Sequence, residues 1–269
     1  MENDTNKKAG IVYSCYYQMS REGEHFVPEH SLTCQIAGSL VLNDGTKEYS
    51  PKAGSIRLIR RNHLIKFIKQ PPPNGEFKSI TIYLQQQILK DYSLEYGIAS
   101  VKKQGGDPVI VLKNSPAMET YISSLLAYQK ANSLSNDQFV AMKQKEAVFL
   151  LLQSNPSLKN ILFDFSEPHK IDLEAFMNKN FHFNVHLDRF AYLTGRSLAT
   201  FKRDFEKQFN STPGHWLQQK RLQEAYYLIA KKGKTASDVY LDLGFEDLSH
   251  FSYAFKKKFG EAPSKVLRR

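Results

Sequence analysis

The sequence predicts an α+β protein: an amino-terminal cupin-like antiparallel β-barrel with two packed helices, followed by an all-α domain of two helix-turn-helix units joined by a long helix. Three observations support this prediction. Residues 11–90 contain short segments rich in β-branched and aromatic residues, separated by turn sequences. From residue 171 onward, apolar residues recur at helical spacing. The last hundred residues also contain an internal repeat at an offset of fifty residues.

The strands of the predicted barrel lie between turns marked by glycine, proline and asparagine. The turn sequences are at residues 43–45, 53–55 and 71–75. Several short strands at this spacing are typical of a small antiparallel barrel or sandwich. The segments with the clearest strand composition are residues 33–42, 55–59, 64–68 and 78–84.

Two helices are expected after the strands. Helical spacing relates four apolar residues of the first helix, and the second helix is predicted over residues 137–152. The apolar face of this pair either mediates dimerisation or covers the core of its own domain, and the sequence leaves both readings open. The four residues, our candidates for the dimerisation surface, are Met118, Ile122, Leu125 and Leu126.

Two prolines mark the expected domain boundary. Pro156 ends the second helix, and Pro168 marks a further interruption. We therefore expect a regulatory or dimerisation domain over residues 1–155, a linker over residues 156–168 and a DNA-binding domain over residues 169–269.

The internal repeat consists of three phenylalanines four residues apart, followed four residues later by a proline. The phenylalanines lie on one face of a helix and must be buried, and the proline follows the end of that helix. Gly195 and Gly244 precede the two copies, and a short amphipathic segment precedes each glycine (residues 187–194 and 235–243). Helix, glycine turn and helix is the layout of a helix-turn-helix unit, whose second helix enters the DNA major groove. The copies are Phe201, Phe205, Phe209, Pro213 and Phe251, Phe255, Phe259, Pro263.

The face opposite each phenylalanine row is expected to contact DNA bases. Arginine and lysine form paired hydrogen bonds with guanine, serine donates or accepts, and small apolar side chains pack on thymine methyl groups. The expected base contacts are Leu198, Ala199, Lys202 and Arg203 in the first copy, and Leu248, Ser249, Ser252 and Tyr253 in the second. The expected phosphate contacts are Arg196, Lys207, Lys220, Arg221, Lys256 and Lys257.

The segment between the copies is predicted to be a helix over residues 216–231, about 24 Å long at 1.5 Å per residue. Such a spacer would place the two reading helices about one DNA turn apart, roughly 34 Å. Charge agrees with a polyanionic partner: the net charge is +10, and residues 170–269 hold 18 basic and 11 acidic residues, a net of +7. We therefore expect double-stranded DNA as a partner.

Composition excludes several other classes of protein. Hydrophobic residues make up 41 % of the 269 residues, enough for a packed core. The longest apolar stretch, residues 147–152, is too short to cross a bilayer, so no membrane partner is expected. Cys15 and Cys34 are the only cysteines, and we expect buried free thiols in a protein of the reducing cytoplasm.

Enzyme chemistry finds little support in the sequence. The histidines and carboxylate near the barrel do not have the His-x-His spacing of metal-dependent cupins, and we see no phosphate-binding glycine loop or nucleophile elbow. We therefore expect no catalysis, metal or cofactor. The arginines at 60 and 61 are expected to be solvated. The alternative is a metal-dependent oxygenase or isomerase with an appended DNA-binding domain, whose candidate ligands would be His25, Glu29, His30 and His63.

Residues 244–264 resemble the second helix-turn-helix unit of the AraC/XylS family of bacterial transcription regulators almost throughout. The first unit is similar through Gly195, Ser197, Phe201, Arg203, Phe205 and Pro213. Asn210 replaces the usual glycine, a change that an asparagine tolerating the left-handed conformation can satisfy. The resemblance implies a seven-helix domain that binds promoter DNA in consecutive major-groove segments, activates transcription by contacting RNA polymerase and reads bases with the two helix faces named above.

The amino-terminal half resembles the regulatory domains of this family, through residues 26–68 and the segment 54–61 (GSIRLIRR). It is most similar to those of type III secretion activators, which implies self-association or binding of a regulatory protein. We therefore expect a homodimer. We also expect a small-molecule effector or a regulatory protein as a further partner. A regulator controlled solely by an inhibitory protein is the remaining alternative.

Overall fold

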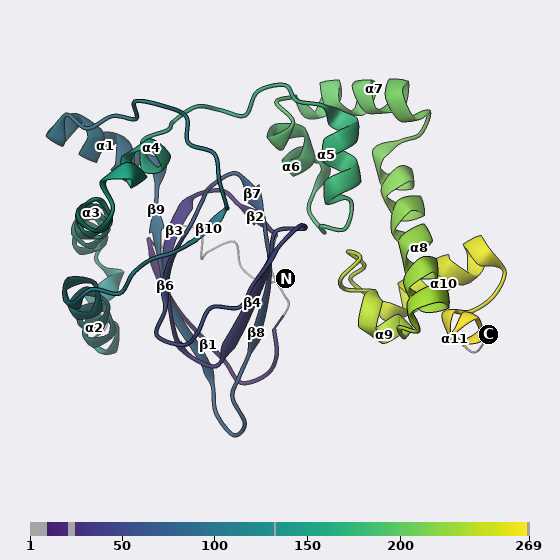
Figure 1. Cartoon of the computed structure of the whole chain (residues 1–269), viewed down its shortest axis with the longest axis horizontal. Helices are drawn as coiled ribbons and strands as arrows, with labels where there is room; N and C mark the ends of the chain where they lie inside the picture. The colour runs from purple at the N-terminus through teal and green to yellow at the C-terminus, as the bar shows by residue number, and fades with distance from the viewer. Residues whose placement is uncertain (1–9, 21–24, 132, 268–269) are drawn as a thin grey trace. The chain divides into compact units, whose positions relative to one another are not determined.

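The computed structural model describes residues 10–20, 25–131 and 133–267. The chain divides into two compact units: residues 25, 26 and 167–267 belong to the second, and the other described residues form the first. Figure 1 shows strands and helices in the first unit and helices in the second, which confirms the predicted α+β class.

The first unit contains two antiparallel sheets that face one another (Figure 1). The larger sheet has the order β1-β9-β3-β6-β10, the smaller has the order β5-β4-β8, and β2 pairs with β7. Their bounds are β1 Ile11–Tyr16, β2 Phe26–Val27, β3 His30–Ala37, β4 Ser39–Asn43, β5 Glu48–Tyr49, β6 Ile56–Ile59, β7 His63–Leu64, β8 Lys66–Gln70, β9 Phe77–Leu84 and β10 Val109–Val111.

The two faces of the larger sheet differ in chemistry. Side chains alternate between the faces along each strand. Its outer face packs on helices through a cluster that includes Leu32, Ile56, Leu58, Ile80 and Ile82. Its inner face lies toward the smaller sheet and has polar residues at alternate positions of the central strands β3, β6 and β9. These polar residues are Ser31, Thr33, Gln35, Arg57 and Ser79.

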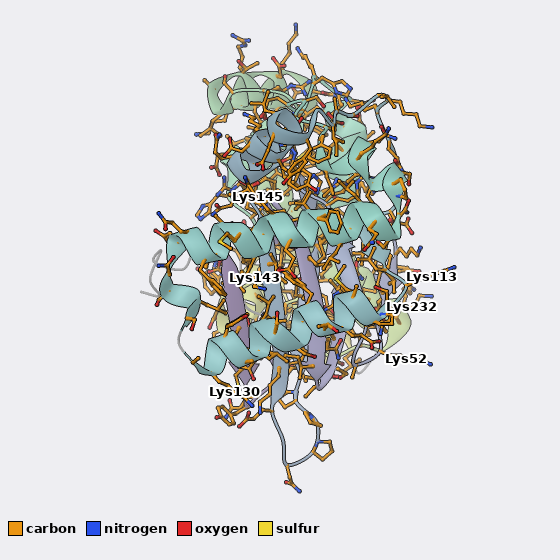
Figure 2. All side chains as sticks on the ribbon, turned by 90° about the vertical axis from the view of Figure 1, so that its left-hand side faces the viewer. Lys52, Lys113, Lys130, Lys143, Lys145 and Lys232 are labelled. Carbon is orange, nitrogen blue, oxygen red and sulfur yellow. The ribbon has the colours of Figure 1, made fainter. Side chains whose placement is uncertain are left out.

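Helices cover the outer face. They are α1 Gln86–Tyr96, α2 Pro116–Lys130, α3 Asp137–Ser154 and α4 Lys159–Leu162. Figure 2 shows α2 and α3 lying across the larger sheet, with Lys143 and Lys145 on α3. Ser115 and Asn136 cap the amino termini of α2 and α3 through their side chains.

The expected dimerisation residues belong to the core of the first unit. Met118, Ile122 and Leu125 on α2 are at most 6 % exposed, and Leu126 packs against the same cluster. The prediction that these four residues mediate dimerisation is therefore wrong, and the alternative that they cover their own core is correct. Helical spacing shows which face of a helix is buried but not against which surface.

The expected linker also differs from the structure. Residues 156–162 form two short helical turns, Pro156–Leu158 and α4, and Leu158, Ile161, Leu162 and Phe163 lie in the core of the first unit. Pro156 occupies the first position of a new turn, where its missing N–H costs nothing. Pro156 therefore follows the end of α3, as predicted, and also begins the next helical turn.

The second unit is helical. Its helices are α5 Leu173–Asn180, α6 Leu187–Leu193, α7 Leu198–Phe209, α8 Pro213–Lys232, α9 Ala236–Val239, α10 Leu248–Phe259 and α11 Pro263–Val266. The connecting helix α8 begins at Pro213 and ends at Lys232, so it extends beyond the predicted residues 216–231 at both ends. Proline is favoured at the first position of a helix, which accounts for the earlier start. In contrast, the predicted segment 235–243 contains only the short α9, followed by turns.

Within the described residues, no helix combines the length and apolar character needed to span a bilayer.

Candidate DNA interface

The phenylalanine row holds α7 against its own unit. Phe201 and Phe205 are 0 % exposed. Phe205 stacks on Phe209 with ring centroids 4.3 Å apart, and both rings contact Trp216 of α8. With this face buried, the opposite face of α7 points to solvent. All four residues expected to contact bases are exposed there: Leu198, Ala199, Lys202 and Arg203.

Gly195 forms the turn between α6 and α7. Its φ of +65° is one that L side chains rarely adopt. A Cβ at this position would lie 2.2 Å from the carbonyl carbon of His169 and 2.4 Å from the nitrogen of Lys170. Glycine is therefore required both for conformation and for space. Ser197 then caps α7 by accepting a hydrogen bond from the Thr200 backbone N–H.

The second copy is built in the same way. Phe251 and Phe255 on α10 are 0 % exposed, and Tyr226 of α8 packs on Phe255 and Phe259. Asp247 caps α10 by accepting from the His250 backbone N–H. The two anchored helices therefore share one scaffold, α8.

The outward face of α10 differs from that of α7. Ser249 and Tyr253 are exposed, and the Tyr253 side chain is 69 % exposed. Ser252 is half-buried, and Leu248 packs partly against the core of the unit. The structure thus presents two of the four expected residues fully to solvent.

Arg221 does not have the role expected of it. Its Nε donates to the Phe181 carbonyl, its Nη1 to the Gly244 carbonyl and its Nη2 to the Phe183 carbonyl, at 2.7, 2.9 and 2.8 Å. Burial lowers the pKa of its guanidinium to about 10. All three nitrogens bind backbone carbonyls within the unit, so the predicted phosphate contact is wrong.

Arg196 is also structural. Its side chain is 7 % exposed, its Nε donates to Asp204 and its Nη1 donates to the carbonyls of Ile171 and Thr194. The prediction of a phosphate contact is wrong here for the same reason. Lys207, Lys256 and Lys257 are exposed, and Lys220 is half-buried between the rings of Phe181 and Trp216.

The histidines considered as metal ligands have other partners. His30 is 3 % exposed, and its Nδ1 accepts from the Arg61 backbone N–H. Burial lowers the pKa of His30 to about 3, so its imidazole is neutral at physiological pH. His63 Nδ1 lies 2.7 Å from the Arg61 carbonyl, and His25 Nδ1 accepts from the Asn184 N–H. In the described ranges, no three His, Cys, Asp or Glu residues are grouped so as to hold a metal ion.

Two further expectations about single residues are wrong. The arginine pair is not solvated: Arg60 donates to the carbonyls of Gln104 and Gly106, and Arg61 donates to those of Asp164 and Ser166. Cys15 is exposed rather than buried, whereas Cys34 is buried as expected. The position of a residue near the end of a predicted strand therefore does not show whether its side chain is exposed or which groups it binds.

Comparisons with known proteins agree with this geometry. Residues 190–269 match a family model described as a helix-turn-helix domain, and residues 30–162 match the ExsA N-terminal regulatory domain. The chain belongs to the AraC/XylS family. It is a DNA-binding transcriptional regulator, and these matches favour that reading over the enzyme alternative.

Two curated proteins and one solved structure are similar to this chain over most of its length. The regulator is 22 % identical to the HTH-type transcriptional regulator ExsA of Pseudomonas aeruginosa, over 94 % of this chain and 91 % of that protein. It is 24 % identical to the thermoregulatory protein LcrF of Yersinia pestis, over 89 % and 90 %. A solved structure, ToxT from Vibrio cholerae O395, has a TM-score of 0.40 and 13 % identity, over 97 % of this chain and 98 % of that one.

Proposed function

We propose that this regulator is a transcriptional activator of the cytoplasm that reads two successive major-groove segments of a promoter with α7 and α10. The observation that carries the proposal is the paired arrangement of these helices. Each has a phenylalanine row on one side, with its first two rings fully buried, and exposed side chains suited to bases on the other. ExsA is named as a transcriptional regulator, and a further relative, VirF of Yersinia enterocolitica, is named as a transcriptional activator, which supports activation as the sign of regulation.

The first reading helix supplies the stronger candidates for base contacts. The Arg203 side chain is 77 % exposed, and among the described residues its ion pair is a loose one of 3.9 Å with Asp204, so its guanidinium fork is available to a guanine. Lys202 lies beside it, and Leu198 and Ala199 offer apolar contacts for thymine methyl groups. On α10, Ser249 and Tyr253 are the exposed candidates, with Ser252 and Leu248 at the margin.

Phosphate contacts are assigned to the lysines that the structure leaves accessible. Lys207 is in the last turn of α7, and Lys256 and Lys257 are in the last turn of α10. These charges follow the ends of the reading helices and are exposed. Lys220 is retained as a weaker candidate. Contacts of this kind fix the register of the protein on DNA without reading sequence.

The first unit is proposed to be the regulatory part, with the second as the DNA-binding part. The match of residues 30–162 to a regulatory domain supports this assignment. Self-association, an effector, a regulatory protein and contact with RNA polymerase belong to the same proposal. Self-association requires a surface other than the buried face of α2.

A selection from a random duplex library with the full-length protein tests the proposal. Two enriched blocks about one helical turn apart are expected, because both helices read bases. The matched control is Arg203→Ala, which should lose preference at one base pair and keep the rest. Enrichment of a single block would reject base reading by the second copy. No enrichment from the full-length protein or from residues 167–269 would reject sequence-specific binding.

A further inference from the structure

Part of the inner face of the larger sheet is polar where a packed core ordinarily is apolar. Ser31, Gln35 and Ser79 on β3 and β9 are at most 4 % exposed, and Thr33 is 7 % exposed. The opposite faces of the same strands carry Leu32, Cys34, Ile80 and Ile82. A chain that needs only a core would not place hydroxyl and amide groups along one face of its central strands.

Arg57 lies at the centre of this polar face. It is opposite Thr33 in the pairing of β3 with β6, and its side chain is 0 % exposed. Its flanking residues Ile56 and Leu58 belong to the cluster beneath the helices, so Arg57 points between the sheets. Ile59, two residues further on and on the same face, packs with Leu42 of the smaller sheet.

The guanidinium of Arg57 has no protein partner in the described structure. Its Nε, Nη1 and Nη2 are all buried without a hydrogen bond. Burial lowers its pKa to about 10, so the group still carries a positive charge at neutral pH. Among the residues that the structure describes, the ionisable group that acts on it is the Cys34 thiol, whose own pKa is raised by burial and which is therefore neutral.

The groups around Arg57 can both accept and donate hydrogen bonds. The hydroxyls of Thr33 and Thr81 lie 3.2 Å apart, and either can donate to the other. Gln35 donates from Nε2 to the Gly38 carbonyl, and its Oε1 is buried without a partner. Three unpaired donors with a positive charge thus lie on the same sheet face as hydroxyls and one unpaired acceptor.

We propose that Arg57 anchors a buried anion-binding site that takes a compact organic carboxylate bearing hydroxyl groups. The planar guanidinium matches a carboxylate through two parallel hydrogen bonds. Hydroxyls on the ligand would pair with Thr33, Thr81 and the Oε1 of Gln35. Leu40 and Leu42 of the smaller sheet lie in the cluster that closes the other side, which favours a small ligand over a long one. The inference rests on the proposed regulatory role of the first unit, for which it names an effector class.

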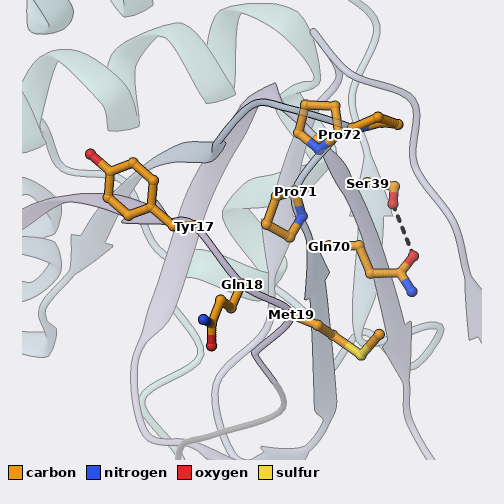
Figure 3. Close-up of a pocket in the computed structure, with 9 residues that line it drawn as sticks. Tyr17, Gln18, Met19, Ser39, Gln70, Pro71 and Pro72 are labelled. Atoms are coloured by element: carbon orange, nitrogen blue, oxygen red, sulfur yellow. Dashed lines mark hydrogen bonds between the residues drawn. The ribbon is translucent and has the colours of Figure 1, made fainter.

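A surface hollow lies next to the end of this polar face. Figure 3 shows Ser39, Gln70, Pro71 and Pro72 around it, with the Ser39 hydroxyl donating to Gln70. Gly38 also lines the hollow, and its carbonyl is the one that binds Gln35. One hydrogen bond therefore links the buried Gln35 side chain to the wall of the hollow.

Water is the competing occupant. Ordered water would satisfy the N–H groups on the three guanidinium nitrogens of Arg57 but would leave its charge without a counter-ion. A carboxylate satisfies both needs. Calorimetric titration of the full-length protein with sodium lactate and with lactamide, at constant ionic strength, separates these cases. Lactamide has the same shape and hydroxyl but no charge.

We expect lactate to bind saturably and lactamide to bind at least about tenfold more weakly, since a charge-assisted pair is roughly twice as strong as a neutral one. Arg57→Met should reduce lactate affinity by about tenfold or more while leaving the protein folded, because an apolar side chain of similar volume replaces an unpaired buried charge. Arg57→Lys keeps the charge without the fork, and should bind lactate with intermediate affinity.

The matched control is Arg60→Met. Arg60 already donates to two loop carbonyls, so its loss should leave lactate affinity within about twofold. Equal binding of lactate and lactamide would overturn the proposal, as would unchanged lactate binding by Arg57→Met. Failure of acetate, lactate and malate alike to bind the folded wild-type protein would overturn it too. Binding of inorganic phosphate alone would reject the carboxylate class.

The titration does not involve DNA, so its failure is distinguishable from that of the proposed function. Lactate binding without sequence-specific DNA binding would reject only the function of α7 and α10. Sequence-specific DNA binding without lactate binding would reject only the carboxylate site.

Discussion

Arg196 and Asp204 are joined by a hydrogen bond of 3.1 Å from Nε to Oδ2, which ties the turn after α6 to the side of α7. Lys170 adds a second positive charge 3.3 Å from the same carboxylate. Because Arg196 also binds two backbone carbonyls, this pair holds the first reading helix at a fixed angle to its own unit.

The pair predicts a pH dependence of stability. The hydrogen bond from Arg196, followed by that from Lys170, lowers the pKa of Asp204. Because the pKa of Asp204 is lower in the folded than in the unfolded protein, its ionised form stabilises the fold. This stabilisation is fully present above the unfolded-state pKa of about 3.9 and is lost as the pH falls through the folded-state pKa. Thermal unfolding measured between pH 2 and 6 should therefore show a steeper acid loss for wild type than for Asp204→Asn. Parallel pH profiles for the two proteins would contradict the role of this pair.

Arg203→Ala should weaken binding to the selected site by about 1–3 kcal/mol and relax preference at one base pair, since a bidentate guanine contact is lost. Lys207→Ala is the matched control on the same helix. It should weaken binding similarly across sequences and reduce the salt slope by about one. Fluorescence anisotropy at several salt concentrations measures both effects. An unchanged base preference for Arg203→Ala would show that α7 is docked differently.

Gly195→Ala should destabilise the protein more than Gly233→Ala. Both glycines have a φ near +65°, so both variants bear the strain of a left-handed alanine, about 1–2 kcal/mol. A Cβ at Gly195 also meets the backbone of His169 and Lys170, whereas one at Gly233 meets nothing within 4 Å. Chemical denaturation of the two variants isolates the steric part. Equal losses would mean that the backbone near residue 169 moves freely aside.

Leu125→Ala should cost about 2–5 kcal/mol of stability, because it leaves a cavity in the core beneath α2. Met142→Ala is the control on α3. Its side chain is 66 % exposed, and the cost should stay within about 0.5 kcal/mol. Denaturation curves give the two values. A change in sedimentation of folded Leu125→Ala, with little loss of stability, would instead restore the dimer reading of this helix face.

Much of the second unit could be predicted from the sequence. The repeat of Phe201, Phe205 and Phe209 requires a helix with one buried face, and so also indicates the exposed face bearing Arg203. Asn210 at φ +48° takes the left-handed position that its replacement of glycine implied. These features follow from neighbours within one or two helical turns, and the periodicity of the chain records them directly.

Contacts between distant segments could not be predicted in this way. Arg196 and Arg221 look like surface cations in sequence, but both donate to backbone carbonyls, up to 40 residues away. Arg57 appears only as one charge within a short apolar strand, and α2 shows an apolar face without showing what covers it. The sequence by itself determined that the two phenylalanine repeats form helices and which face of each is apolar. The tertiary structure alone decided which charges are buried and what they bind, because burial depends on the segment that packs opposite and periodicity carries no information about that segment.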